Sequence, residues 1–440
     1  MPRPAKLFNR DFLLLWQGQS ISRLGIQAFA IAMLFWIKHA TDSATAMGVL
    51  LMLSNLPAVI LGPIGGTLAD RYSRRAIILA SETLNGVAVL SLAALMFSAP
   101  DATDIILIWL FIVSLFGAIV SSFFNPAMSA AIPDLVPADR VNAANSLSQS
   151  AAQIAVFIGQ GIGGTLFRLL GAPILFLING LTYLYSAACV WLIRIPQTIP
   201  PRPGDGRDQF AIFKNDLRAG LRYVWSTRGL RELVILSALL NFFTAPIVVL
   251  LPFYIEDTLK VSVDWYGAML AVYGIGSVIG YGLGALKLAG RARSRVMIAL
   301  ILVEALGYGL LGWARDPISA LALALIGGGV GGLVGILITT LLQITTPGEI
   351  RGRVFGFLAT IAGSITPIAM GLTGIIADAL DQNIPLIYAS CGALLFTISA
   401  LIASRREFRM FLAFENQDAR ADLPGQDLEG RDLKALPNAK

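Results

Sequence analysis

Charged residues and the residues of metal and redox chemistry are scarce in this chain. Only 14% of its 440 residues are charged, whereas a soluble domain has about 25%. It has one histidine, His39, and two cysteines, Cys189 and Cys391, which both fall within apolar runs. No disulfide framework or metal-ligand cluster can be built from this set. We therefore expect neither a metal centre nor any other cofactor.

The polar segments also lack the motifs of an enzyme. They contain no nucleophile paired with a base and no glycine-rich loop that could hold phosphate. An enzyme or a membrane receptor is therefore the less favoured class of function.

Apolar runs are what the chain has in abundance, since 56% of its residues are hydrophobic. A bilayer core of about 30 Å is crossed by about 20 apolar residues in a helix. These runs predict an all-α polytopic membrane protein with twelve transmembrane helices. The expected spans are 11–38, 45–69, 76–97, 105–130, 144–170, 172–195, 230–255, 263–288, 296–314, 318–343, 354–379 and 385–403.

The first run follows a short basic segment, as the apolar part of a signal peptide does. Gln17, Gln19 and Arg23 interrupt it, so we expect this segment to be retained as the first span.

Lysine and arginine are distributed unevenly between the two sides of the predicted bundle. Of the 33, 28 fall on the side of the N-terminus and four on the other side, while Arg23 lies inside the first span. The positive-inside rule then places both termini and the long middle loop in the cytoplasm. We expect the protein to lie in the inner membrane of the cell. The basic surplus suits anionic lipids as partners, and no nucleic acid is needed to explain it.

A polar, proline-rich stretch, "PQTIPPRPGDGRD" (196–208), divides the spans into two sets of six. We expect an N-terminal six-helix bundle over 1–195, a cytoplasmic linker over 196–229, a second bundle over 230–403 and a disordered cytoplasmic tail over 404–440. Within the linker, apolar residues from Phe213 to Trp225 recur every three or four positions. This pattern fits a helix in the membrane interface and equally a helix packed on the protein.

The two halves repeat short motifs. "PADRVNAANSL" (137–147) precedes span 5 and "PGEIRGRVFGF" (347–357) precedes span 11, 210 positions later. "GGTLADRYSRR" (65–75) ends span 2, and a degenerate copy, "GALKLAGRARS" (284–294), ends span 8 after 219 positions. Parallel repeats of this kind predict two pseudo-symmetric bundles with a transport site between them near the midplane.

The segment "GGTLADRYSRR" (65–75) resembles the signature of the major facilitator superfamily, G-x-L-A-D-R-x-G-R-[RK], with Ser73 in place of one glycine. The stretches 9–22, 124–137 and 251–259 are similar to the branch with macrolide exporters and enterobactin-type siderophore exporters. The resemblance implies the major facilitator fold and a monomeric secondary active transporter with alternating access. It also implies proton-coupled efflux of an amphipathic small molecule, drug-like or siderophore-like. A lysophospholipid or other lipid transporter, or an importer of the same fold, is the alternative.

The resemblance also implies a gate on the cytoplasmic side. Asp70 would face the start of span 11, where free backbone N–H groups give the helix a partial positive charge. The missing side chain of Gly66 would let helices approach closely, and the arginines would pair with Asp70 or Glu349. Those arginines could equally be topology signals. The expected gate residues are Gly66, Asp70, Arg71, Arg74, Arg75, Glu349, Arg351 and Arg353.

Ionisable residues inside a membrane span are costly and are therefore candidates for function, and three of them stand out here. Glu304, Glu82 and Arg23 are our candidates for proton coupling. Adding the repeat offset of 219 to the position of Glu82 gives residue 301, one helical turn from Glu304. Ile26 stands where the similar exporters often have an acid. Glu82 could instead reach the headgroups, Glu304 could be a packing acid, and Arg23 could be a counter-charge or line a water-filled cavity.

Polar and aromatic residues within the spans are candidates for contact with a substrate, although amides in membrane helices more often join helices to one another. The candidates are Gln27, Asn55, Gln153, Asn241, Phe242 and Tyr254.

Overall fold

The computed structural model describes residues 6–197, 206–284 and 290–414 of the chain. Within these ranges, eleven helices are long and apolar enough to cross a membrane. Residues 198–205 of the expected linker and residues 415–440 of the expected tail lie outside the described residues.

The first half of the chain forms one set of packed helices. These are α1 (Arg10–Thr41), α2 (Ala44–Arg71), α3 (Arg74–Ser98), α4 (Thr103–Leu135), the short turn η1 (Ala138–Arg140) and α5 (Val141–Leu192). The last of these contains two spans, because Gly171 has a φ of 74° and breaks the helix between them. A positive φ suits glycine, which has no Cβ. The break falls at the boundary expected between 144–170 and 172–195, and it brings the number of spans to twelve.

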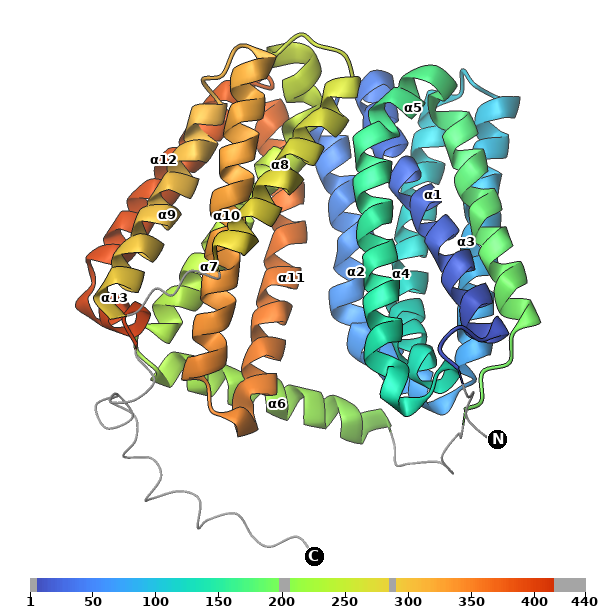
Figure 1. The fold of residues 1–440 in the computed structure, drawn as a ribbon. Coiled ribbons are helices and arrows are strands. Elements are labelled where there is room, and N and C mark those ends of the chain that lie inside the picture. Colours follow the sequence, from blue (N-terminus) through green and yellow to red (C-terminus); the bar gives the residue numbers. More distant parts are fainter. Residues whose placement is uncertain (1–5, 198–205, 285–289, 415–440) are drawn as a thin grey trace, which may run out of the picture.

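The second half forms a similar set beside the first (Figure 1). It contains α7 (Leu230–Phe253), the π-helical turn η2 (Tyr254–Thr258), α8 (Asp264–Leu283), α9 (Gly290–Leu311), α10 (Pro317–Thr345), α11 (Gly348–Ala379), α12 (Ile384–Ser404) and α13 (Arg406–Leu412). Helix α6 (Gly206–Ser226) runs below the second set toward the first, on the side where α1 begins and α13 ends. We call this side the face of the termini and the other side the opposite face. The expected all-helical architecture of twelve spans in two bundles is confirmed.

The two bundles meet closely on the opposite face. A Cβ added to Gly48 of α2 would collide with the carbonyl of Met370 in α11, and one added to Gly374 would collide with the carbonyl of Ala44. Absent side chains thus allow the two helix backbones to touch, as small residues do in membrane helix pairs.

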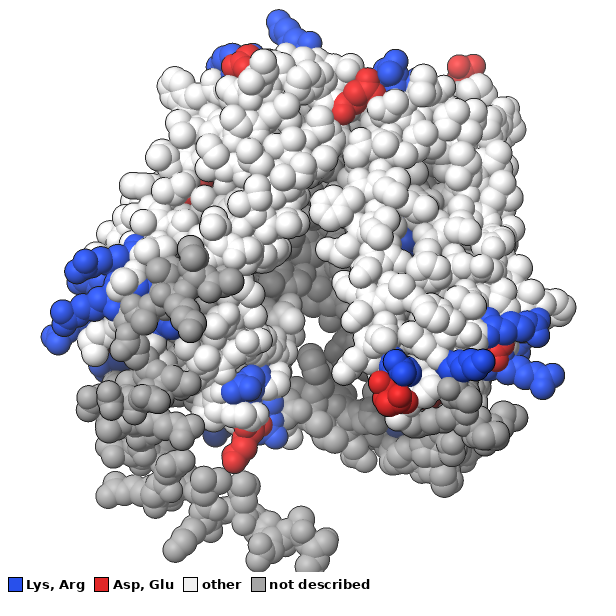
Figure 2. Space-filling view, in the orientation of Figure 1, with Lys and Arg blue, Asp and Glu red and all other residues white. Residues whose placement is uncertain are grey.

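The same two helices separate toward the face of the termini. A Cβ added to Gly62 or Gly66 of α2, or to Gly352 or Gly356 of α11, would meet nothing within 4 Å. The space-filling view is hollowed between the two halves on this side (Figure 2). The bundles therefore enclose a space that is closed at the opposite face and open at the face of the termini.

Helix α6 combines a packed side with an exposed one. Gly220 lies against the backbone of Arg353 in α11, and Val224 is completely buried. Leu221 and Trp225 are 40% and 53% exposed. The helix thus rests on the protein and still presents apolar side chains outward.

Candidate functional site

A carboxylate of one bundle caps a helix of the other at the opposite face. Asp378, in the last turn of α11, accepts hydrogen bonds from the Ser43 hydroxyl at 2.8 Å and from the backbone N–H groups of Ala44 and Thr45 at 3.0 and 2.9 Å. These groups begin α2. The first N–H groups of a helix have no partner within it, and the helix dipole favours a negative charge there. Asp378 therefore ties the end of α11 to the start of α2.

Ion pairs join the bundles at two further places on this face. Lys38 of α1 lies 3.1 Å from Glu256 and 3.0 Å from Asp257, both in η2, and His39 lies 2.9 Å from Glu256. Lys38 is only 7% exposed, so its charge depends on these partners.

The second ion pair lies 2.9 Å apart, between Arg168 of α5 and Asp264 of α8. Near it, a Cβ added to Gly164 would collide with the carbonyl of Val263. Together with the Asp378 cap, three pairs of helices are joined across the bundles on the opposite face.

The expected gate residues lie around the open end, and the described bonds of two of the arginines are made within the first bundle. Arg74 pairs with Asp134 of α4 at 2.5 Å, and Arg75 donates to the carbonyls of Val190 and Trp191 in α5 at 3.2 and 2.5 Å. The described partners of both arginines thus lie within their own bundle, and pairing of the arginines with Asp70 or Glu349 stays a prediction. The side chain of Asp70 lies outside the described residues.

The partner side of the expected gate is exposed. Glu349, Arg351 and Arg353 lie in the first turns of α11 and are open to solvent, and Arg351 donates to the carbonyl of Thr346 at 3.3 Å. Arg71 ends α2, beside Gly66, whose missing Cβ faces open space here instead of a neighbouring helix.

Glu82 lies in a satisfied polar network inside the first bundle. One carboxylate oxygen accepts a hydrogen bond from the amide of Gln19 at 2.6 Å, and the other accepts one from the Ser22 hydroxyl at 3.4 Å. The same amide donates to Ser186 at 2.9 Å. Glu82 is only 2% exposed, so it does not reach the headgroups. Arg23 lies near it but donates its hydrogen bond to the carbonyl of Ser148 at 3.0 Å.

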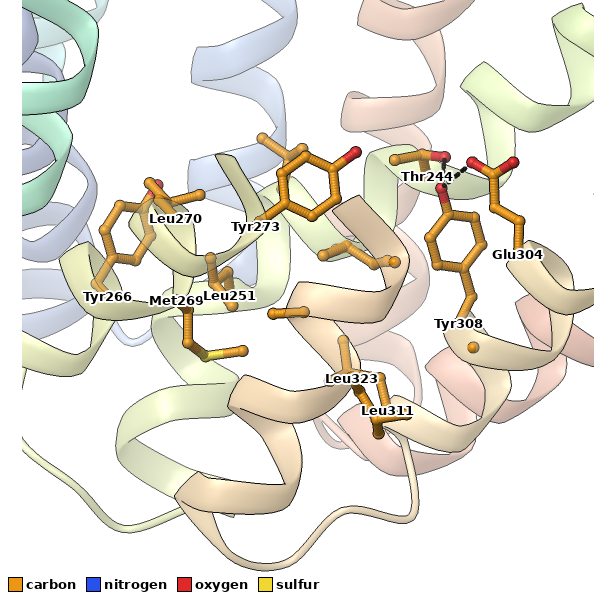
Figure 3. A pocket seen from close by; sticks show the side chains of 15 residues that line it. Thr244, Leu251, Tyr266, Met269, Leu270, Tyr273, Glu304, Tyr308, Leu311 and Leu323 are labelled. Atoms are coloured by element: carbon orange, nitrogen blue, oxygen red, sulfur yellow. Dashed lines mark hydrogen bonds between the residues drawn. The ribbon is translucent and has the colours of Figure 1, made fainter. Parts of the chain in front are cut away.

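Glu304 has different surroundings. It lines a cavity of about 210 Å³ between α7, α8, α9 and α10 (Figure 3). One of its oxygens accepts from the Tyr308 hydroxyl at 3.0 Å, and Tyr308 in turn accepts from Thr244 at 3.1 Å. The other oxygen is buried, and no described residue donates a hydrogen bond to it. Of these two acids, Glu304 is the one that lines this cavity.

Few of the expected substrate contacts lie in a recognisable cavity. Asn55 and Asn241 are exposed, and each donates to a carbonyl one turn earlier in its own helix. Tyr254 is completely buried and donates to the carbonyls of Leu311 and Ala314, so it tethers η2 to the end of α9 and does not line a cavity.

The other three candidates are placed as follows. Phe242 packs edge-to-face on Phe243, with ring centroids 5.4 Å apart. Gln27 lies against Gly159 between α1 and α5, and Gln153 is exposed on α5. A role for any of them in binding a substrate stays a prediction.

Asp378 and the charged residues of the opposite face were not expected from the sequence. A signal for Asp378 was nevertheless present: α2 ends with "GTLAD" (66–70) and α11 ends with "GIIAD" (374–378). The shared pattern G-x-x-A-D places an acid at the end of each helix, one turn after a glycine.

We expect Asp378→Asn to loosen the opposite face, because the substitution keeps the size of the side chain and removes the charge that the start of α2 favours. Charge-assisted hydrogen bonds of this kind contribute about 1–3 kcal/mol. The measurement is the distance distribution between spin labels at residues 101 and 315, exposed on this face in different bundles. A longer-distance population should grow by about fivefold or more.

The matched control is Asp316→Asn, since Asp316 is on the same face but caps its own helix, α10. This control should leave the distances unchanged. Identical distributions in Asp378→Asn and the unsubstituted protein would contradict the assignment of Asp378 as a tie between the bundles.

Comparisons with known proteins agree with this architecture. The model of the Major Facilitator Superfamily matches residues 15–370. The chain is 24% identical to Macrolide efflux protein A of Streptococcus pyogenes over 391 residues, which cover 84% of this chain and 90% of that protein. It is 25% identical to Multidrug efflux pump Tap of Mycolicibacterium fortuitum over 389 residues, or 85% of this chain and 91% of that protein.

A solved structure shares the fold as well. A bacterial homologue of the human lysosomal transporter Spinster, in an inward-facing and unoccupied conformation, aligns with a TM-score of 0.65 and 15% identity over 93% of this chain and 97% of its own. The family match covers most of the chain and agrees with the twelve spans in two bundles. The protein is thus a multi-pass membrane transporter for a small-molecule substrate, not an enzyme, and it belongs to the Major Facilitator Superfamily.

Proposed function

We propose that the protein exports an amphipathic small molecule in exchange for protons. In this proposal it lies in the inner membrane with both termini in the cytoplasm, and it works as a monomer. The observation that carries the proposal is the buried acid Glu304, which faces a cavity in a transporter whose two bundles are closed at one end and open at the other. The names of the two curated relatives, both efflux proteins, support export as the direction.

Alternating access would follow from two helix caps that cannot form together. Asp378 caps α2 at the opposite face in the arrangement described here. By the shared pattern G-x-x-A-D, Asp70 at the other end of α2 would cap the start of α11 once the face of the termini closes. Each cap is made in only one state, so each biases the equilibrium between the two states.

Asp70→Asn should therefore act in the opposite direction to Asp378→Asn. Because it would weaken only the state with a closed face of the termini, we expect the distances between labels at 101 and 315 to shift toward the shorter population. Expression should be retained and transport should fall. A shift in the same direction as Asp378→Asn, or no shift under turnover, would reject the paired-cap mechanism.

Proton coupling is assigned to Glu304 in this proposal. An isolated charge in apolar surroundings is costly, so a carboxyl group there is either protonated or paired with a cation. Glu82 is bonded through both oxygens, whereas one oxygen of Glu304 has no described donor, so in this proposal Glu82 serves as a packing acid.

We expect Glu304→Gln to abolish uphill transport driven by a pH gradient and to preserve downhill exchange of labelled substrate. Glutamine keeps the shape of a protonated glutamate and its hydrogen bonds but cannot release a proton. The assay uses purified protein in proteoliposomes, with Glu82→Gln as the matched control in the other bundle. In the control, uphill transport and downhill exchange should either both stay unchanged or both fall to the same extent. If the double variant still concentrates substrate under a pH gradient, neither acid carries the proton.

The orientation in the membrane has its own test. Lysine and arginine gather on the face of the termini, as Figure 2 shows for both halves. A reporter inserted within 200–208, or fused after Arg406, should behave as cytoplasmic, whereas one inserted at 100–103 should behave as external. An external signal from the insertion within 200–208 would reject the proposed topology.

A further inference from the structure

The cavity beside Glu304 has an unusual combination of walls. Fifteen residues line it, and its only polar side chains are those of Thr244, Tyr266, Tyr273, Glu304 and Tyr308. The remaining walls are aliphatic side chains, methionine and glycine. All of the residues that line the cavity belong to the second bundle, in α7, α8, α9 and α10 (Figure 3).

One polar atom in this cavity has no partner. Glu304 is 9% exposed, and its second carboxylate oxygen receives no hydrogen bond from any described residue. A buried oxygen without a partner is destabilising by roughly 1–3 kcal/mol. The fifteen described residues of the lining include no lysine, arginine or histidine that could neutralise the group.

Tyrosine hydroxyl groups lie close to the same carboxylate, and the rings that carry them line the cavity. A Cβ added to Gly331 would lie 3.4 Å from the other oxygen of Glu304 and 3.4 Å from the Tyr273 hydroxyl, so these two groups converge on one point. Tyr308 contacts the carboxylate directly. Aromatic faces beside an acid attract organic cations, through the ring quadrupole and the negative charge together.

Other ligand classes fit this cavity less well. A divalent metal ion needs about six or more oxygen ligands, which a single carboxylate and hydroxyl groups do not provide. An anion would be repelled, and a neutral apolar molecule would leave the second oxygen of Glu304 unsatisfied. The volume of about 210 Å³ is below the range of about 300–1,000 Å³ that is typical of sites for drug-sized ligands.

We propose that this cavity is a binding site for the cationic group of an apolar amine or quaternary ammonium compound, with Glu304 as its counter-ion. A small amine would enter whole, and a larger substrate would insert one positively charged arm. Binding exchanges the proton on Glu304 for the cation, and the proton passes to water. The inference deepens the proposed function and rests on it for this exchange, whereas its test measures binding and needs no transport.

The test uses two probes that differ only in charge: benzyltrimethylammonium and its neutral carbon isostere, neopentylbenzene. Their affinities for the purified full-length protein in detergent are measured by calorimetry or thermal shift. The unsubstituted protein should bind the cation at least tenfold more tightly than the neutral probe. Glu304→Gln should reduce affinity for the cation by about tenfold or more and leave the neutral probe unchanged, which also shows that the cavity is intact.

Two further variants complete the design. Glu82→Gln removes the corresponding acid of the first bundle, which does not line this cavity, and should not alter either affinity. Gly307→Leu should weaken both probes, because Gly307 lines the cavity and a Cβ there meets nothing within 4 Å. The proposal is overturned if neither probe binds the unsubstituted protein, if Glu304→Gln retains the cation, or if Glu82→Gln loses it equally.

The outcome separates this inference from the proposed function. If Glu304→Gln loses the cation but still couples uphill transport to a pH gradient, the binding site stands and the proton role of Glu304 fails. If the unsubstituted protein binds no cation while Glu304→Gln loses coupling, the proton role of Glu304 stands and the cation-binding site fails.

Discussion

The contact between a carboxylate and the unpaired N–H groups that begin a helix sets the arrangement of this transporter. Asp378 supplies that contact to α2 across the boundary between the bundles, and the glycines Gly48 and Gly374 let the two backbones touch beside it. Membrane helices cannot leave backbone groups unsatisfied at low energetic cost. A helix that begins at a bundle boundary is therefore capped either by its own residues or by the other bundle, and here the other bundle shares the task with Ser43.

The two intramembrane acids show how related positions can acquire different roles. Glu82 and Glu304 lie in the third span of their respective bundles. In the first bundle, α1 supplies Gln19 and Ser22 to the acid, and each oxygen of the acid has a partner. In the second bundle, α7 supplies Thr244 only through Tyr308, and a cavity remains. A pseudo-symmetric fold thus bonds one acid through both oxygens and leaves the other beside a cavity with one oxygen that has no described donor.

Much of the fold could be predicted from the sequence, because a span is a local property of about 20 residues. Even the break at Gly171 lies where the sequence divides two apolar runs. The pairing of Arg74 with Asp134 could not be predicted, since it depends on how α2, α3 and α4 pack. Asp378 lies between these cases: its position at a helix end is visible in the repeated G-x-x-A-D pattern, but its partner across the bundles is set by tertiary structure. The cavity beside Glu304 is a volume between four helices that no side chain fills, and a residue pattern does not reveal such a volume.

The charges that join the bundles on the opposite face differ in how they respond to dissolved salt. Arg168 is 53% exposed in its pair with Asp264, and ions in solution screen such pairs over a Debye length of about 8–10 Å. The bonds from the backbone of α2 to Asp378 are short, directional and far less subject to screening. Two kinds of interaction therefore hold the opposite face closed. A higher ionic strength on that face weakens the exposed ion pair but has little effect on the hydrogen bonds to Asp378.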